Sequence, residues 1–211
     1  MATVLIVSKT QMRNGVCVGG IIEQTCELIR IHNERGGNLS DDAPYEIGDR
    51  WIMNVEDAWN ARPEPHVEDK QTSPIEKINN VGLSGIINFI RTHNFGARLT
   101  NGRLEETFEG CLFIQGNRNF VNREDIPSFS TQFCIPSFST QFWIADSDLI
   151  YTEQFGKHYY RYKQTRLKFV GFQEIVKRIP AGTIIRLSLA NWWDGDGSGE
   201  DRCYLQLSGW Y

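Results

Sequence analysis

The segment Glu27-Leu-Ile-Arg-Ile-His32 indicates the kind of secondary structure from which this chain is built. Its two isoleucines alternate with a leucine, an arginine and a histidine. A period of two residues is typical of a β-strand that packs one face on a core and presents the other to water. We therefore expect a strand over residues 27–32.

Further short apolar or alternating runs lie on both sides of this segment. Their hydrophobic positions are mainly Ile, Val, Phe, Trp and Tyr, which fit a pleated, half-buried surface. These runs predict strands over residues 3–7, 15–23, 49–55, 111–115, 142–145, 159–162, 167–172, 183–189 and 203–207. Many short strands with few helices are typical of small barrels or a β-sandwich.

One segment carries a clear helical pattern. Ser73 suits an N-cap, Pro74 the first helical position and Glu76 the acidic member of a capping box. Isoleucines at helical spacing extend the pattern to about His93, with two intervening glycines as the expected break. We therefore expect one helix or helix pair over residues 73–93, and a single helical turn within residues 173–179.

Charge is distributed unevenly along the 211 residues, a length that suits one large or two small domains. The formal net charge of −4 argues mildly against a protein dedicated to coating DNA. Residues 41–69 contain nine acids against two arginines, whereas residues 157–186 contain eight Lys or Arg against a single Glu. A polyanion would therefore meet the second half of the chain.

The five cysteines are odd in number and form no CxxC pair; they are Cys17, Cys26, Cys111, Cys134 and Cys203. This pattern predicts buried, reduced thiols and not a disulfide framework or a zinc site. The N-terminus lacks the basic region of a signal peptide, and no apolar run approaches the roughly 18 residues of a membrane span. We expect a cytoplasmic protein with no membrane partner and no metal or other cofactor.

Residues 126–143 contain a tandem duplication. Ile126-Pro-Ser-Phe-Ser-Thr-Gln-Phe-Cys134 is followed directly by Ile135-Pro-Ser-Phe-Ser-Thr-Gln-Phe-Trp143, with eight of nine positions identical. Because a nine-residue shift is odd, a continuous strand would point the two copies to opposite faces of a sheet. We expect the second copy to lie in the sheet and the first to be accommodated in a loop.

The stretch Lys157-His-Tyr-Tyr-Arg-Tyr-Lys-Gln-Thr-Arg-Leu-Lys168 combines positive charge with aromatic rings. On a strand, Tyr159 and Arg161 share one face, and the tyrosines at 160 and 162 share the other. Arg and Lys neutralise phosphates, and an aromatic face contributes about 1–3 kcal/mol for each base stacked on it. The alternative is an ordinary solvated hairpin whose tyrosines face the core. Both interpretations fit the residues.

Trp192 and Trp193 follow the strand predicted over residues 183–189. Adjacent residues point to opposite faces of a strand, so at least one tryptophan is expected at an edge or an interface, where it adds stacking surface. The predicted nucleic-acid contacts are Lys157, Tyr159, Arg161, Lys163, Arg166, Lys168, Trp192 and Trp193.

Three other motifs carry weaker signals. Gly15-Val-Cys-Val-Gly-Gly20 lacks the Gly-Lys-Ser/Thr of a phosphate-binding loop and favours close backbone packing or a bulge in a β-hairpin. Residues 194–201 resemble the start of a calcium loop, but Leu205 stands where a bidentate Glu is needed, which favours a glycine-rich hairpin loop. His66 has carboxylates nearby, and a surface or loop-anchoring role is favoured there over catalysis.

Several motifs together resemble the bacterial dual OB-domain family. They are Val4-Leu-Ile-Val-Ser-Lys-Thr10, Gly15-Val-Cys-Val-Gly-Gly20, Pro44-Tyr-Glu-Ile-Gly-Asp-Arg-Trp51, Pro65-His-Val-Glu-Asp69, Arg186-Leu-Ser-Leu-Ala-Asn-Trp-Trp193 and Arg202-Cys-Tyr-Leu-Gln-Leu-Ser-Gly-Trp210. The resemblance spans nearly the whole chain and implies two OB-like barrels with a nucleic-acid-binding role, often in bacterial or phage-defence contexts. It brings no catalytic residues, and the duplicated nonapeptide departs from the family pattern.

The expected fold is therefore mainly β with minor α: two small OB-like barrels packed together, with one helix or helix pair between them. The expected domains are residues 1–96, with the trailing helix, and residues 97–211, with the duplicated loop. The leading hypothesis is a non-catalytic module that binds single-stranded or structured nucleic acid. Two alternatives stay open: an adaptor subunit that docks on a helicase, nuclease or ATPase, and a metal-dependent hydrolase that uses Asp194, Asp196 and Glu200.

Overall fold

The segment Glu27–His32 forms strand β3, as predicted, but neither of its faces is fully open to water. Ile29 and Ile31 pack into the core of a small barrel, whereas Leu28 packs outward against the second half of the chain. The face expected to be wet is covered because the two halves of the molecule meet there. The computed structural model describes residues 1–12, 14–58, 64–123, 134–194 and 201–211.

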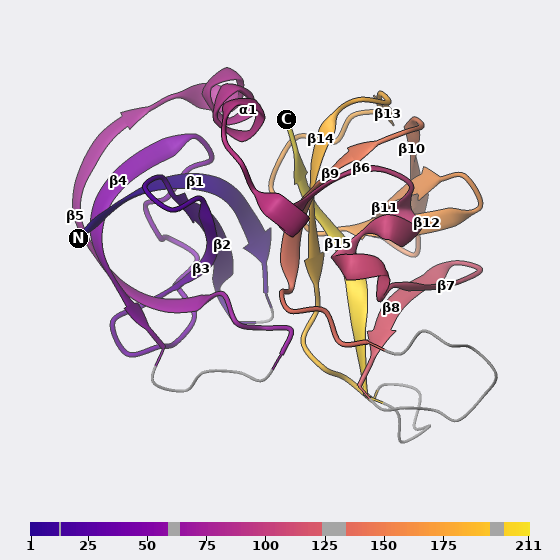
Figure 1. The fold of residues 1–211 in the computed structure, drawn as a ribbon, viewed down its shortest axis with the longest axis horizontal. Coiled ribbons are helices and arrows are strands. Elements are labelled where there is room, and N and C mark those ends of the chain that lie inside the picture. Colours follow the sequence, from indigo (N-terminus) through magenta and orange to yellow (C-terminus); the bar gives the residue numbers. More distant parts are fainter. Residues whose placement is uncertain (13, 59–63, 124–133, 195–200) are drawn as a thin grey trace.

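The N-terminal half folds into a closed barrel of five strands, seen on the left of Figure 1. Its strands are β1 (Ala2–Gln11), β2 (Val16–Ile22), β3 (Glu27–His32), β4 (Asp49–Asp57) and β5 (Asp69–Asn80), in the spatial order β1-β2-β3-β5-β4. Pairing of β1 with β4 closes the ring, and β3 runs parallel to β5. Closure removes the unpaired sheet edges through which β-proteins associate.

The helix predicted from residue 73 begins later than expected. Residues 73–80 belong to β5, which pairs with β4 through two register shifts. The capping pattern at Ser73 is overridden because this pairing satisfies the backbone groups that a helix would satisfy internally. Helix α1 (Gly82–Thr92) ends before His93, as predicted. Gly82 has a φ of +63°, a conformation that favours glycine, so it makes the turn from β5 into α1.

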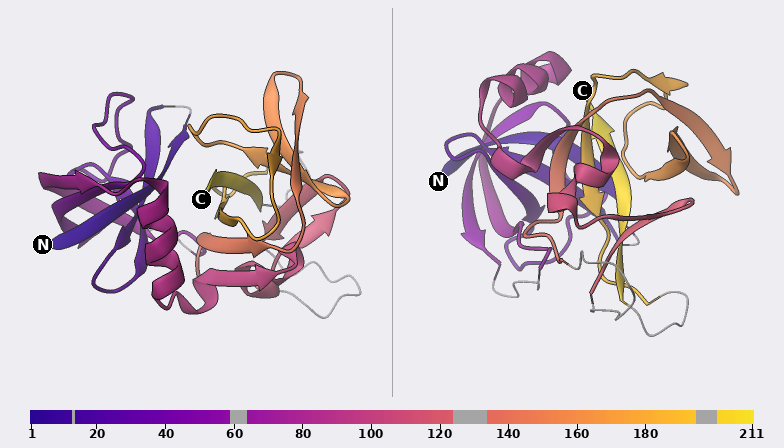
Figure 2. Two further views of the ribbon diagram at one scale, coloured as in Figure 1. Left: turned by 90° about the horizontal axis from the view of Figure 1, so that it is seen from above. Right: turned by 45° about the vertical axis from the view of Figure 1, so that its right-hand side comes forward.

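The C-terminal half is a large curled sheet and not a second closed ring (Figures 1 and 2). Its strands are β6 (Leu99–Gly102), β7 (Phe113–Gln115), β8 (Arg118–Asn122), β9 (Thr140–Ala145), β10 (Leu149–Gln154), β11 (Lys157–Tyr162), β12 (Thr165–Phe169), β13 (Arg178–Ile179), β14 (Ile184–Leu189) and β15 (Arg202–Trp210). The main path is β13-β10-β11-β12-β15-β14-β9-β6, and the β7–β8 hairpin joins it at β15.

Helical structure is sparse, as the sequence predicts. Besides α1 there are three short 3-10 helices, η1 (Gly96–Arg98), η2 (Leu104–Glu106) and η3 (Phe108–Gly110), among the described residues. The helical turn expected within residues 173–179 does not form, because Arg178 and Ile179 pair with β10 as strand β13. Within the part of the chain that the structure describes, no helix has the length and apolar character needed to cross a membrane.

The two halves share a hydrophobic core along their seam. Helix α1 contributes Ile86 and Ile90, the barrel contributes Leu5, and the curled sheet contributes Phe142 and Tyr211. In Figure 1 the helix and the C-terminus both lie between the two halves. The two units are therefore packed together with the helix between them, as expected. The division at residues 96/97 stays a prediction.

Close packing explains the glycines at positions 19 and 20. A Cβ on Gly19 would lie 2.5 Å from Arg186 Nη2, which belongs to the other half, and 2.5 Å from Ser8 Oγ. A Cβ on Gly20 would lie 2.6 Å from Val4 Cγ1. The β1–β2 hairpin shows both predicted features, close packing at its glycines and a register shift between Ile6 and Ser8, and Gly19 makes room for an arginine at the seam.

The second copy of the nonapeptide enters the sheet, as predicted. Residues 140–143 begin β9, and Trp143 is fully buried. Glu68, a buried carboxylate before β5, accepts hydrogen bonds from the N–H groups of Ser139 and Thr140 and from Ser139 Oγ. The barrel thus fixes the strand that follows the duplication. Residues 126–133 of the first copy lie outside the described residues, so their expected loop stays a prediction.

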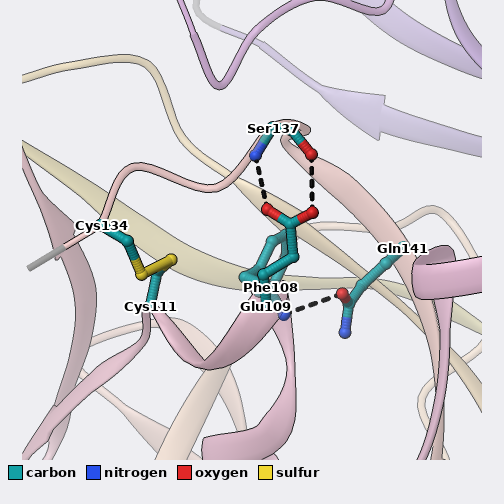
Figure 3. Close-up of a disulfide and its surroundings, with 6 residues drawn as sticks. All are labelled: Phe108, Glu109, Cys111, Cys134, Ser137 and Gln141. Atoms are coloured by element: carbon teal, nitrogen blue, oxygen red, sulfur yellow. Dashed lines mark hydrogen bonds between the residues drawn. A yellow bond between two sulfur atoms is a disulfide. The ribbon is translucent and has the colours of Figure 1, made fainter. Parts of the chain in front are cut away.

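The expectation that all the cysteines are reduced thiols is wrong for one pair. Cys111 and Cys134 form a disulfide, with their Cα atoms 5.3 Å apart (Figure 3). The fold brings the end of the first nonapeptide copy beside η3, where Glu109 also accepts two hydrogen bonds from Ser137. This proximity depends on tertiary structure, which an odd cysteine count cannot reveal. The other three cysteines are free. Because one pair is oxidised, the cysteines do not indicate a reducing compartment.

Candidate nucleic-acid interface

Strand β11 divides the basic stretch between two faces. Tyr160 and Tyr162 are buried in the core of the curled sheet, where Tyr162 packs edge-on against Trp143 with 5.0 Å between ring centroids. Lys157, Tyr159 and Arg161 alternate with them and lie on the outer face, as predicted. One half of the stretch therefore stabilises the fold, and the other half is available to a ligand.

Strand β12 places more cations on the same outer face. Tyr159 lies opposite Lys168, and Arg161 lies opposite Arg166. Side chains directly opposite each other project to the same side of a sheet, and like charges in that position repel. The Arg166 guanidinium lies 4.5 Å from the centroid of the Tyr159 ring and donates a hydrogen bond to Gln154 Oε1. The outer face therefore concentrates positive charge, with Arg166 held in place by Tyr159 and Gln154.

The outer face forms one wall of a hollow of about 620 Å³, which we call the basic groove. It is lined by Asn117, Arg118, Asn119, Lys157, Tyr159, Arg166, Lys168, Ala190, Asn191, Trp192, Trp193, Tyr204, Leu205 and Gln206. The structure thus brings together six of the eight predicted contact residues. Four of the lining side chains are cationic, four are aromatic, and none of those described is acidic. Such a surface can neutralise phosphates and stack on bases.

The opposite wall comes from the β7–β8 hairpin and is fixed to β12 by Asn119. The Asn119 amide donates to the Arg166 carbonyl at 2.9 Å and accepts from Thr165 Oγ1 at 2.8 Å. Strand β8 also pairs with β15, which places Tyr204 opposite Phe120. The groove is therefore bounded by paired strands, so its cations are held on a rigid support.

The two tryptophans have different environments, as the alternation of a strand requires. Trp192 is partly buried, and its Nε1 donates to the Glu64 carbonyl of the N-terminal half at 3.0 Å. Trp193 is 60% exposed, and its ring centroid lies 6.0 Å from that of Tyr204. Trp192 is thus fixed at the seam, while Trp193 presents an open ring to the groove.

Two predicted contact residues do not line the groove. Arg161 is exposed on the outer face of β11 but lies beyond the groove lining. Lys163 occupies a turn at φ +48°, with Nζ 2.8 Å from Asp146 Oδ2. The hydrogen bond to Asp146 raises the pKa of Lys163, so this cation is engaged within the fold.

Sequence reasoning missed the groove residues of β8 and β15, chiefly Arg118, Asn119 and Tyr204. The dipeptide Gly116-Asn117, set between two short β-type runs, is a hairpin signal that could have revealed the β7–β8 hairpin. No local signal places Tyr204 in the groove, because the parallel pairing of β12 with β15 joins distant segments.

His66 has the loop-anchoring environment, and not the surface position, of the two that the sequence left open. It is buried, and its Nε2 lies 3.5 Å from Cys203 Sγ in β15. Burial raises the pKa of the Cys203 thiol, so the sulfur stays protonated and is not an activated nucleophile. The contact therefore joins the loop before β5 to the curled sheet.

The acids named for a metal site are only partly described. Asp194 is exposed, while Asp196 and Glu200 lie outside the described residues. Trp193 and Arg202 pair in antiparallel fashion on either side of this loop, which is consistent with the predicted hairpin. Across the described ranges, no group of three or more His, Cys, Asp or Glu side chains could hold a metal ion.

Comparison with known proteins agrees with this architecture. A family model described as a dual OB-containing domain matches residues 2–210. The chain belongs to this dual OB family. Searches of curated proteins and of solved structures found no match. A closed barrel followed by a large curled sheet is consistent with a dual OB fold; we call these the two OB-like units, and the basic groove lies on the second.

Proposed function

We propose that this dual OB chain is a non-catalytic module that binds single-stranded nucleic acid in the basic groove. The supporting observation is that four cationic and four aromatic side chains converge there, with no acid among the described lining residues. OB folds bind oligonucleotides across a strand face, and the groove lies on such a face. The resemblance to bacterial dual OB proteins favours a setting in defence or nucleic-acid processing.

Unpaired charge supports the proposal. Lys157 and Lys168 take part in no ion pair within the described parts of the chain. A lysine that is paired internally, such as Lys163, has less to gain from a phosphate. The charges of Lys157 and Lys168 are therefore available to a polyanion, which would release its counterions on binding.

The exposed ring of Trp193 supports a single strand over a duplex. A duplex keeps its base faces stacked on one another, whereas a single strand can offer them to aromatic side chains. Trp193 and Tyr159 both line the groove, so two rings of different exposure are available for stacking. Because every base has a face that can stack on an aromatic ring, we expect weak sequence preference.

Titration with short single-stranded DNA and RNA, followed by fluorescence anisotropy at low salt, tests the proposal. The double variant Lys157→Ala with Lys168→Ala should weaken binding about tenfold or more, since two phosphate contacts are lost. The matched control is Lys163→Ala, which removes a lysine of the same stretch that lies outside the groove. Absence of binding by the unaltered protein, or equal losses in both variants, would contradict the proposal.

An adaptor role is the second candidate, and Phe155 is the observation in its favour. This side chain is 91% exposed at the tip of the β10–β11 hairpin, outside the basic groove. An exposed ring on a hairpin tip is suited to insertion into a pocket of a partner such as a helicase or nuclease. Phe155→Ala should then abolish co-purification with that partner while leaving nucleic-acid binding unchanged.

A further inference from the structure

A second cavity lies at the seam between the two OB-like units. It measures about 240 Å³ and includes Cys17 and Arg30 of the barrel together with Thr140, Arg186 and Ser188 of the curled sheet. We call it the seam cavity. It shares lining residues Ala190, Asn191 and Gln206 with the basic groove, so the two hollows are contiguous.

Arg186 is a buried cation in the wall of this cavity. The residue is 3% exposed, and among the described residues no carboxylate lies within ion-pairing distance of it. Its Nη1 donates to Ser208 Oγ at 2.8 Å, and its buried Nε has no acceptor among the described atoms. A guanidinium has five N–H donors, so most of its hydrogen-bonding capacity is unused.

Two half-buried arginines near the seam are neutralised by acids. Arg30 Nε lies 2.7 Å from Asp69 Oδ1, and Arg98 Nη1 lies 2.9 Å from Glu68 Oε1. Arg186, by contrast, forms no ion pair with a described carboxylate, so its positive charge has no anionic partner within hydrogen-bonding distance. Burial lowers the pKa of Arg186 and outweighs the opposing influence of Tyr211, Cys17 and the Glu68 carboxylate. An uncompensated charge of this kind costs stability unless a counter-ion is bound.

The remaining lining groups are suited to an oxyanion. Ser188 carries a hydroxyl group, Asn191 and Gln206 carry amides, and no described lining residue is acidic, while the Thr140 hydroxyl donates to Glu68. The planar guanidinium fork matches the spacing of two phosphate oxygens and forms charge-assisted hydrogen bonds with them. Gly19 leaves space for this fork, because a Cβ there would lie 2.5 Å from Nη2.

We infer that the seam cavity is a phosphate-binding site, with Arg186 as the principal ligand of one phosphate group. The phosphate belongs either to a free nucleotide or to a strand that continues from the basic groove. The inference rests on the proposed function only if the phosphate belongs to a bound strand. The phosphate site and the binding of a free nucleotide do not depend on it. Binding at the seam would join the two OB-like units through a shared anion, since residues of both units line the cavity.

Thermal unfolding of the full chain in sodium phosphate and in sodium chloride of equal ionic strength tests the inference. Phosphate at ten times its Kd should raise the Tm by about 3–6 °C beyond chloride, because it binds only the folded state. Arg186→Met should lose this increment while retaining or raising the Tm in chloride, since an unpaired buried charge is replaced by an apolar chain. Arg186→Lys keeps the charge without the fork and should retain part of the increment.

The control is Arg103→Met, which removes an exposed arginine that is paired with Glu106 and does not line the cavity. It should keep the full phosphate increment. Equal Tm values in phosphate and chloride, or the same increment in Arg186→Met as in the unaltered protein, would overturn the inference. A large fall in Tm for Arg186→Met in chloride, with the increment intact in Arg186→Lys and Arg103→Met alike, would also overturn it, because Arg186 would then be purely structural.

Two further arms identify the source of the phosphate. If adenosine monophosphate raises the Tm of Trp193→Ala as much as that of the unaltered protein, the seam cavity binds the nucleotide independently of the basic groove. If Arg186→Met weakens the binding of a short oligothymidylate about tenfold, the phosphate belongs to a strand. Failure of the groove proposal would remove oligonucleotide binding but leave the inorganic phosphate increment in place, so the two failures can be told apart.

Discussion

The two OB-like units differ in how many of their key charged side chains form ion pairs within the fold. The N-terminal barrel is rich in acids, but its buried acids are paired: Asp49 lies 2.8 Å from Lys77 Nζ, and Glu68 lies 2.9 Å from Arg98 Nη1. In the basic groove, Lys157 and Lys168 have no ion-pair partner among the described residues. A chain with a net charge of −4 can therefore carry a cationic surface, because the fold leaves Lys157 and Lys168 without ion pairs.

The units also differ in their sheet edges. The barrel is closed by β1–β4 pairing, whereas the curled sheet stays open and receives the β7–β8 hairpin at β15. A closed ring of five strands buries its interior and offers only its outside. The open sheet can hold a groove between its face and an added hairpin, which is where the unpaired cations lie.

The largest expected effect comes from breaking the charge pairing at the seam. Glu68→Ala leaves Arg98 and the groups of Ser139 and Thr140 without their shared acceptor, and should lower the free energy of unfolding by about 3–5 kcal/mol. Denaturant unfolding measures this loss. Glu106→Ala removes an exposed carboxylate paired with Arg103 and should cost less than about 1 kcal/mol. Equal costs would refute the special role of Glu68.

Reduction of the Cys111–Cys134 disulfide should have the next largest effect. The bond closes a loop with a sequence separation of 23, and losing it should cost about 3 kcal/mol. Both cysteines lie in the C-terminal half, so hydrogen exchange should increase in the curled sheet before it increases in the barrel. Cys111→Ser should reproduce the effect without reductant. An unchanged Tm on reduction would show that the bond contributes nothing to stability.

A smaller effect is expected from removing the open ring of the groove. Trp193→Ala should weaken binding of single-stranded DNA by about 1–3 kcal/mol. The free energy of unfolding of this variant should change little, because the Trp193 side chain is 60% exposed. Phe155→Ala is the matched control, since it removes a ring of even greater exposure outside the groove. Anisotropy titrations with both variants distinguish stacking in the groove from a general loss of aromatic surface.

The smallest effect concerns pH and the paired acid of the barrel. Burial of Asp49 would raise the pKa of its carboxyl, but hydrogen bonds from Lys77 and Asn80 outweigh burial and hold that pKa below its usual 3.8. A lowered pKa contributes stability above the unfolded value, and this contribution is lost as the pH falls through the folded value. Unfolding free energies should therefore fall below about pH 4, and the fall should be shallower in Asp49→Asn.

Most of the fold could be predicted because alternation is local. Residues 27–32, 49–55 and 183–189 carry their strand signal within their own sequence, and each appears as a strand. Residues 73–80 carry an equally local helical signal that is overridden by pairing with β4. The Cys111–Cys134 disulfide was missed because the chain between the two cysteines does not indicate that its ends meet.

The candidate site was predictable only in part, for the same reason. The alternation in β11 identified Tyr159 as outward and Tyr160 as inward, since that depends on neighbours in sequence. Lys163 was included because it belongs to the basic run, but a turn directs it to Asp146. The seam cavity could not be predicted at all, because it needs the contact between two units.

The salt dependence of single-strand binding tests the central claim most directly. If the four groove cations each neutralise one phosphate, the slope of log K against log salt should be about −2.8, at about −0.7 per phosphate on a single strand. The Lys157→Ala, Lys168→Ala protein should show a slope of about −1.4, and Lys163→Ala the slope of the unaltered protein. A slope near zero, or one unchanged by loss of the two groove lysines, would contradict the account.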